Sequence, residues 1–369
     1  MLDNMTYWIE NADSALLLPT LPAASVDALV TDPPAGIGFM GKEWDDFRRA
    51  RNPADAGRDS VHGRLSRSGP EYGRRDRDHF IAWLAGILTE CRRIMKPGAY
   101  GWVWAIPRTS HWTAMACEDA GFAVRDVMTH IQSQGFPKSR SSLKPAAEHW
   151  ILIKAPGELR ELRIEENRIA GKPDKPGSIR ATRHYDGHEN QTGYELIPAP
   201  EPPAGRWPAN FALSHSDDCA DTCVEDCPVR LLDGQSGELQ SGKMKAGTTR
   251  HTRQGSALGM MPAKTKANTI GDSGGASRFF YVAKASTKER SAGLPDRNSH
   301  PTVKSIALMR HLIRLIAAPG SLILDPFTGS GSTAVAALQE GCRFAGIERD
   351  PQYAETAQLR AQHALATHS

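Results

Sequence analysis

The stretch Ser321-Leu-Ile-Leu-Asp-Pro-Phe-Thr-Gly-Ser-Gly-Ser-Thr-Ala334, followed by Arg343-Phe-Ala-Gly-Ile-Glu-Arg-Asp350, decides the fold. An apolar run ends at Asp-Pro, a Gly-x-Gly turn follows, and a helical segment leads to a second apolar run that ends on Glu348. This pattern predicts a strand, loop, helix and strand that hold a nucleotide-like ligand. Gly329 and Gly331 would let the backbone approach that ligand, and Glu348 could accept hydrogen bonds from a ribose.

The residues around the turn favour one class of ligand. The spacing Gly329-x-Gly331-x-x-Ala334 also fits a dinucleotide site, but Asp325 would repel a pyrophosphate. A carboxylate there suits a cationic or amino-bearing ligand, so S-adenosylmethionine is favoured over NAD and over an oxidoreductase function. Only about twenty residues follow Glu348, too few for the rest of a doubly wound sheet. The sequence therefore predicts an α/β fold with a circularly permuted Rossmann-like sheet.

Composition sets the remaining bounds. The chain has 369 residues, of which 40% are hydrophobic and 24% charged, with a formal net charge of +3. These values are ordinary for a soluble protein of one large or two smaller domains. No apolar stretch is long enough for a membrane span and no signal peptide is evident, so we expect a cytoplasmic protein with reduced cysteines. Two runs, Arg48 to Arg77 and Lys243 to Lys266, are basic; they are either solvated loops or contacts to phosphate.

A second motif lies near the start of the chain. The strand-like run Val26 to Thr31 leads directly into Asp32-Pro-Pro-Ala-Gly36. A strand that ends in Asp-Pro-Pro fixes a carboxylate and a rigid turn at the carboxyl edge of a sheet, where open α/β folds bind ligands. Taken alone, it could be an acidic turn after a buried strand. Together with the C-terminal loop, it predicts a catalytic site.

The two motifs together resemble those of the amino DNA methyltransferases. Asp32-Pro-Pro-Ala35 is similar to their catalytic Asp-Pro-Pro-Tyr, and Asp325-Pro-Phe-Thr-Gly-Ser-Gly331 to their S-adenosylmethionine loop. The catalytic motif comes first, as in the beta group of that family. The resemblance covers roughly residues 5–155 and 275–365, and it implies methyl transfer from S-adenosylmethionine to the exocyclic amino group of a flipped DNA base, with adenine N6 preferred and cytosine N4 as the alternative.

The resemblance also implies roles for individual residues. Asp32 and the carbonyl of Pro33 would accept the two N–H bonds of the target amine. Asp13 would read the cofactor adenine, and the segment from Asn298 to Lys304 would cradle its methionine end. The expected cofactor-binding residues are Asp13, Asp32, Asn298, His300, Pro301, Thr302, Lys304, Asp325, Pro326, Phe327, Gly329, Ser330, Gly331 and Glu348.

Ala35 departs from the family pattern, because the family has a base-stacking aromatic residue there. Phe39 or Trp44, in the glycine-rich stretch that follows, could fold over the pocket instead. The expected catalytic residues are therefore Asp32, Pro33, Pro34, Ala35, Phe39 and Trp44. A cofactor- and DNA-binding pseudoenzyme, or methylation of RNA or protein, are the alternatives to an active DNA methyltransferase, which could be a restriction-modification or an orphan enzyme.

The expected organisation has three parts. Residues 1–155 would form the catalytic half of the sheet and residues 276–369 the cofactor half. Within these, helices are predicted over 79–95, 110–120 and 305–317, and strands over 99–105, 123–131 and 148–154. Residues 156–275 are rich in proline and glycine and would be an irregular insert, apart from the more regular stretch Arg206 to Leu213. The resemblance makes this insert a target-recognition region; otherwise it could be disordered. The expected partners are double-stranded DNA and, as an open alternative to a monomer, a second copy of the chain.

A cluster of metal-ligating residues lies in that insert, His215-x3-Cys219-x3-Cys223-x3-Cys227. It supplies the four nitrogen and sulfur ligands of a tetrahedral zinc, although the spacing is not that of a standard finger. On a single helix, positions four apart drift round the axis, so the segment would have to bend. A structural zinc and reduced, partly buried cysteines are the two interpretations.

Overall fold

The computed structural model describes residues 5–37, 45, 74–132, 143–170, 205–216, 218–219, 222–240, 272–283, 287–296, 298–300 and 302–368. The chain divides into two compact units. The first consists of Met1–Arg163, Ala209–Leu231 and Tyr281–Ser369, and the second of Ile164–Pro208 and Leu232–Phe280.

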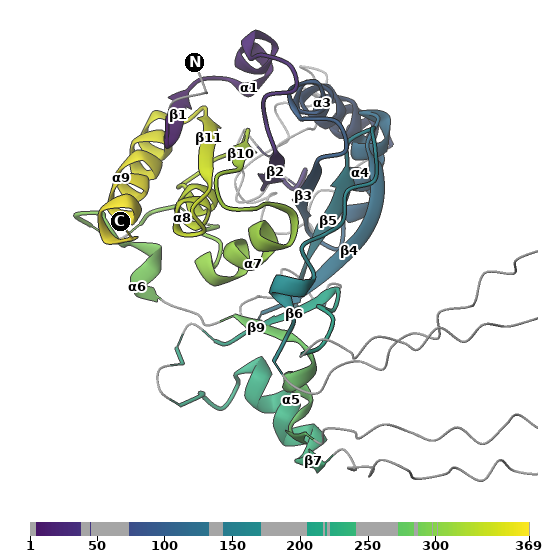
Figure 1. Ribbon diagram of the computed structural model, residues 1–369, viewed down its shortest axis with the longest axis vertical. Coiled ribbons are helices and arrows are strands. Elements are labelled where there is room, and N and C mark those ends of the chain that lie inside the picture. The colour runs from purple at the N-terminus through teal and green to yellow at the C-terminus, as the bar shows by residue number, and fades with distance from the viewer. Residues whose placement is uncertain are drawn as a thin grey trace, which may run out of the picture. The chain divides into compact units, whose positions relative to one another are not determined.

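A nine-stranded sheet forms the centre of the first unit (Figure 1). Its strands in chain order are β1 (Tyr7–Asn11), β2 (Ala28–Thr31), β3 (Tyr100–Ala105), β4 (Ala123–Ile131), β5 (Ala147–Lys154), β6 (Phe211–Ser214), β9 (Tyr281–Ala283), β10 (Leu322–Asp325) and β11 (Arg343–Glu348). They lie side by side in the order β1-β11-β10-β2-β3-β5-β4-β6-β9. Neighbours are parallel except that β5 runs antiparallel to both β3 and β4.

This order confirms the predicted permutation. The late strands β10 and β11 lie between β1 and β2, which come from the beginning of the chain. The Gly-x-Gly loop after β10 and the Asp-Pro-Pro turn after β2 therefore leave from neighbouring parallel strands, at the same edge of the sheet.

Helices cover both faces of the sheet (Figure 1). On one face lie α1 (Ser14–Leu17), α3 (Arg74–Ile94) and α4 (Ser110–Asp119), and on the other α7 (Ile306–Ile316), α8 (Ser332–Gln339) and α9 (Pro351–His368). Two further helices of the chain are α5 (Pro228–Ser236) and α6 (Thr287–Arg290). The predicted helices and strands are found within a few residues of their expected bounds.

Helical spacing explains how α3 packs. Phe80, Leu84 and Leu88 recur every four residues, are fully buried, and belong to the same core cluster as Leu29 of β2 and Val103 of β3. On the opposite face, the indole Nε1 of Trp102 donates a hydrogen bond of 3.0 Å to the carbonyl of Leu312 in α7. Successive residues of β3 therefore bind the helices of the two faces.

The more regular stretch of the insert contributes a strand to the sheet. Residues 211–214 form β6, which pairs in parallel with β4, and β9 pairs with β6. Ala212 and Leu213 are buried, and such short apolar runs gain stability when they extend a sheet. Residues 209–231 thus belong to the same unit as the sheet, although the expected boundary placed them in the insert.

The second unit contains a short antiparallel pair, β7 (Leu239–Gln240) with β8 (Ser273–Gly274). Arg206 forms an ion pair with Asp272, and its guanidinium lies 4.7 Å from the ring centroid of Phe279. In the part of the chain that the structure describes, no helix combines the length and the apolar character that crossing a bilayer requires.

Candidate active site

Two carboxylates meet where β2 and β10 end. Asp32 directly follows β2, and Asp325 is the last residue of β10. The hydroxyl of Thr31 donates a hydrogen bond of 2.8 Å to Asp325 Oδ1, which ties the two strand ends together. The two sequence motifs therefore form one site, as their pairing predicted.

Asp325 lies beneath the cofactor loop and is 1% exposed. Oδ1 also accepts the N–H of Phe327 at 3.0 Å, and Oδ2 accepts the hydroxyl of Thr333 in α8 at 2.6 Å. Burial raises the pKa of Asp325 to about 7, although these hydrogen bonds act in the opposite direction. The side chain was expected to meet an amino-bearing ligand. In the structure its hydrogen-bond partners come from the loop, from β2 and from α8.

The glycines of the loop are required for two different reasons. Both have positive φ, +52° at Gly329 and +82° at Gly331. A Cβ at Gly329 would lie 3.1 Å from Nε2 of His300, whereas one at Gly331 would lie 2.8 Å from the Cα of Ala357 in α9. Gly329 therefore leaves room on the side of the 298–304 segment, while Gly331 allows α9 to pack against the start of α8.

Glu348 ends β11 and holds the loop from the other side. Its Oε2 accepts the N–H of Gly329 at 2.7 Å and its Oε1 the N–H of Asp350 at 2.8 Å. Burial raises the pKa of this carboxyl. Each carboxylate oxygen can accept more than one hydrogen bond, so the group can still accept ribose hydroxyls. Asp13 follows β1, the neighbour of β11, and its Oδ1 accepts the N–H of Ala15 at 2.9 Å as the N-cap of α1.

The segment from Asn298 to Lys304 lies against the cofactor loop through His300. Asn298 Oδ1 accepts the N–H of His300 at 3.0 Å, and His300 Nδ1 accepts the N–H of Thr302 at 3.3 Å. Burial and the positive charges of Lys304 and Arg360 lower the pKa of His300 to about 4. The ring is therefore neutral, with its proton on Nε2 facing Gly329.

Lys304, whose charge acts on His300, reaches the carboxylate of Asp32. Its Nζ is 2.9 Å from Asp32 Oδ2, 3.8 Å from Glu148 Oε1 and 3.8 Å above the ring of Trp104. Burial raises the pKa of Asp32 to about 6, and the ammonium of Lys304 opposes that rise. The sequence had suggested that Lys304 cradles the methionine end of the cofactor. In the structure its ionic partners are the carboxylates of Asp32 and Glu148, and the role towards the cofactor stays a prediction.

A chain of polar side chains continues from Lys304 across the sheet. Although burial works in the opposite direction, Lys304 and His130 hold the pKa of Glu148 at about 2. His130 on β4 pairs in register with Glu148 on β5, its Nδ1 lies 3.2 Å from Glu148 Oε2, and its Nε2 lies 2.8 Å from the hydroxyl of Ser214 at the end of β6.

Sequence reasoning missed Glu148, His130 and Ser214, because the strands of the first two were assigned to the core without chemistry and Ser214 was placed in the insert. One signal was present for Glu148, which stands at the polar start of a strand whose residues 150–153 are all apolar.

The turn after Asp32 is held by buried contacts. The carboxylate of Asp45 accepts the N–H of Gly36 at 2.6 Å and of Ile37 at 3.3 Å, and Thr109 Oγ1 donates to the carbonyl of Ala35 at 2.9 Å. Pro33 is buried, and Pro34 and Ala35 are partly exposed. Three expected site residues, Phe39, Trp44 and Pro301, lie outside the described residues, as do most of the two basic runs.

The other expected residues lie in or beside the loop. Pro326 and Phe327 follow Asp325, and the rings of Phe327 and Trp83 are 5.7 Å apart. The carbonyl of Ser330 accepts a hydrogen bond of 2.6 Å from the buried Arg360 of α9. The four predicted metal ligands lie apart from this loop and also come together, near the end of β6; they are His215, Cys219, Cys223 and Cys227.

Comparison with known proteins gives the following matches. A family model described as DNA methylase matches residues 26–359. A protein of Escherichia coli (strain K12) named YubD, described only provisionally as a methylase, is 49% identical over 61 residues, which are 16% of this chain and 27% of that protein. The DNA adenine methyltransferase YhdJ of Escherichia coli (strain K12) is 38% identical over 60 residues, which are 16% of this chain and 20% of that protein. The matched stretch thus spans about a quarter and a fifth of these two relatives.

Two solved structures are similar at low identity. The PvuII DNA methyltransferase, cytosine-N4-specific, is 13% identical with a TM-score of 0.49, and the match covers 96% of this chain and 86% of that one. The complex of M1.HpyAVI with SAM is 15% identical with a TM-score of 0.42, and the match covers 96% of this chain and 99% of that one.

Proposed function

Because this chain belongs to the N6/N4 DNA methylase family, we propose that it moves a methyl group from S-adenosylmethionine to an exocyclic amino group of a base in double-stranded DNA. The observation that carries the proposal is the meeting of Asp32 and the 325–331 loop on neighbouring parallel strands, joined by the hydrogen bond between Thr31 and Asp325. A catalytic carboxylate and a cofactor loop at one sheet edge are what a group transfer between two bound molecules requires.

The residues at this edge fit the cofactor. Glu348 offers carboxylate oxygens to a ribose at the end of β11, and Asp13 follows on the next strand. The loop reaches its close approach through Gly329, where a Cβ would crowd His300. Neutral His300 and Asn298 would border the methionine end. When bound, S-adenosylmethionine supplies an electrophilic sulfonium methyl group.

Asp32 would accept one N–H of the target amine and the carbonyl of Pro33 the other. These bonds draw the nitrogen towards tetrahedral geometry and aim its lone pair at the methyl group. Positioning of this kind can lower a barrier by roughly 7–11 kcal/mol. Lys304, 2.9 Å from Oδ2, opposes the protonation of Asp32 that burial favours and thereby keeps the acceptor charged at neutral pH.

We further propose adenine N6 as the acceptor, with cytosine N4 as the alternative. The support is the YhdJ relative, which is named a DNA adenine methyltransferase and is 38% identical over 60 residues. Genomic DNA as substrate would place the activity in the cytoplasm. The second candidate function is a pseudoenzyme that binds DNA and cofactor without transferring a methyl group. Ala35 motivates it, because no base-stacking aromatic residue stands at that position.

Sequencing of modified bases in DNA from a host that expresses the protein tests the proposal. We expect N6-methyladenine in one sequence context, and none with Asp32→Ala expressed at the same level. N4-methylcytosine would move the assignment to the alternative base. Unmodified DNA, together with no transfer of labelled methyl groups in vitro by protein that binds the cofactor, would indicate the pseudoenzyme.

A further inference from the structure

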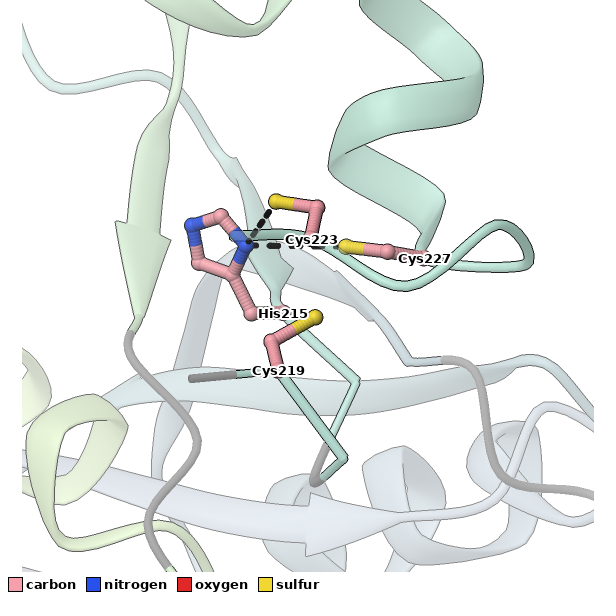
Figure 2. A group of neighbouring side chains, drawn as sticks. All are labelled: His215, Cys219, Cys223 and Cys227. Atoms are coloured by element: carbon pink, nitrogen blue, oxygen red, sulfur yellow. Dashed lines mark hydrogen bonds between the residues drawn. The ribbon is translucent and has the colours of Figure 1, made fainter. Parts of the chain in front are cut away.

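The side chains of His215, Cys219, Cys223 and Cys227 converge on one point in the first unit (Figure 2). One nitrogen or sulfur atom from each lies within 4.8 Å of each of the others. The four cysteine and histidine side chains belong to neither the catalytic carboxylate nor the cofactor loop. None of the six cysteines of the chain forms a disulfide. The cluster therefore needs its own explanation.

Two turns bring the four residues together. His215 directly follows β6, and its N–H donates to the carbonyl of Ala283 in β9 at 3.0 Å. The N–H of Cys219 donates to the carbonyl of Ser216 at 3.0 Å, and that of Cys227 to the carbonyl of Val224 at 3.2 Å. Residues spaced four apart would diverge on a straight helix, but this segment bends before α5 begins at Pro228. The bend that a shared metal requires is present in the backbone.

The distances agree with tetrahedral coordination. With Zn–S near 2.3 Å and Zn–N near 2.0–2.1 Å, a tetrahedral centre separates nitrogen from sulfur by about 3.6 Å and sulfur from sulfur by about 3.8 Å. His215 Nδ1 lies 3.3 Å from Cys223 Sγ and 3.5 Å from Cys227 Sγ. Figure 2 shows Nδ1 facing these two sulfurs, with the sulfur of Cys219 on the third side. A disulfide would need two of these sulfurs at about 2.05 Å and would leave the imidazole without a role.

The surroundings also suit thiolate ligands. Cys227 is fully buried, and backbone N–H groups of Ser216, Val229 and Arg230 point to its sulfur. Hydrogen bonds of this kind orient metal-bound thiolates and offset part of their charge. The side chain of Arg230 donates to the carbonyl of Cys223 at 3.1 Å, which fixes the middle of the segment.

We propose that His215 Nδ1 and the sulfurs of Cys219, Cys223 and Cys227 bind one structural Zn²⁺ ion. Three thiolates and one imidazole favour zinc over harder cations, and four protein ligands leave no open position for substrate. Each thiol that coordinates the metal releases its proton to solvent. The ion would join the end of β6 to the start of α5, one residue after Ser214, the hydroxyl partner of His130. This proposal stands independently of the methyltransferase function.

Metal analysis of the full-length, untagged protein tests the site. We expect about one equivalent of zinc in the wild type, a loss of most of it in the double variant Cys219→Ser/Cys223→Ser, and an unchanged content in Cys117→Ala, whose cysteine lies in α4 outside the cluster. Full zinc content in the double variant would overturn the proposal.

A second measurement on the wild type covers the case in which the double variant does not fold. After removal of zinc by a chelator, titration with Co²⁺ alone should give thiolate-to-metal charge-transfer bands and the intense visible bands of tetrahedral cobalt, saturating at about one equivalent. Protein that is folded by circular dichroism, contains no zinc and gives no such bands would refute the site.

Discussion

At the scale of single residues, the proposed role of Asp32 as an acceptor of an amine N–H favours a charged carboxylate, yet Asp32 lies where burial disfavours charge. Its pKa of about 6 is the balance between that burial and Lys304. No local pattern could have indicated this balance, because positions 32, 148 and 304 meet only after the sheet has formed. The Asp-Pro-Pro motif located the carboxylate. Its cationic partner, Lys304, was expected among the cofactor-binding residues, because the resemblance to the methyltransferase family implies that role.

Asp32→Ala should reduce methyl transfer by several orders of magnitude, because the amine loses its charged acceptor; carboxylates in such roles typically contribute roughly 10²–10⁴-fold. Steady-state transfer of labelled methyl groups to DNA measures this, and calorimetry with S-adenosylmethionine serves as the control for folding and cofactor binding. Retention of more than about a tenth of wild-type turnover would exclude the role.

The pH dependence of turnover reports the same carboxylate. Activity should fall as pH decreases through about 6, because Asp32 then gains a proton. Lys304→Gln removes the charge that favours the carboxylate, so the pKa of Asp32 rises and the acid limb should move to higher pH. Lys304→Arg keeps the charge and should leave the limb near its wild-type position. Identical limbs in the Gln variant and the wild type would show that another group titrates.

At the scale of elements, the prediction succeeded where one segment carries its own periodicity. The helix around Phe80, Leu84 and Leu88 and the strand, loop and helix after Ser321 are examples. It failed for β6 and β9, which are only four and three residues long and whose stability comes from strands elsewhere in the chain. The run Phe211 to Ser214 lies among segments rich in proline and glycine, whose composition indicates irregular structure, so it was not assigned to the sheet.

Two variants separate the loop's contact with α9 from its contact with ligand. Glu348→Ala should weaken S-adenosylmethionine binding in calorimetry, because the carboxylate no longer supports Gly329 or offers an acceptor to the ribose. Gly331→Val should weaken it as well, but through loss of packing, since φ is +82° and its Cβ would lie 2.8 Å from Ala357.

Thermal unfolding distinguishes the two effects. The midpoint should fall clearly for Gly331→Val and less for Glu348→Ala. Wild-type affinity in both variants would mean that the cofactor pocket lies elsewhere.

At the scale of the whole molecule, binding to duplex DNA should depend on the basic runs Arg48 to Arg77 and Lys243 to Lys266. Each phosphate neutralised contributes roughly 0.9 to the slope of log affinity against log salt. Charge reversal of arginines or lysines in either run should therefore lower DNA affinity and flatten its salt dependence, while cofactor affinity stays the same. Fluorescence anisotropy with labelled duplexes at several salt concentrations measures both quantities.

A control for this experiment is Arg343, which begins β11 and belongs to neither run in the sequence. Arg343→Glu should leave the salt dependence as it is. If reversal in both runs also leaves it unchanged, these charges are solvated surface and the phosphate contacts lie elsewhere.

The pairing of β1 with β11 sets the order in which the protein can be completed during translation. Asn11 lies opposite Glu348, and a side-chain hydrogen bond between these residues spans 337 positions of sequence. At roughly 5–20 residues per second, a ribosome needs about 20 to 70 s to make the chain between them. During that interval β1 has no partner on its β11 side, and its unpaired hydrogen-bonding groups are open to strands of other chains. The edge of the sheet where Asn11 lies opposite Glu348 is therefore assembled only after β11 has been made.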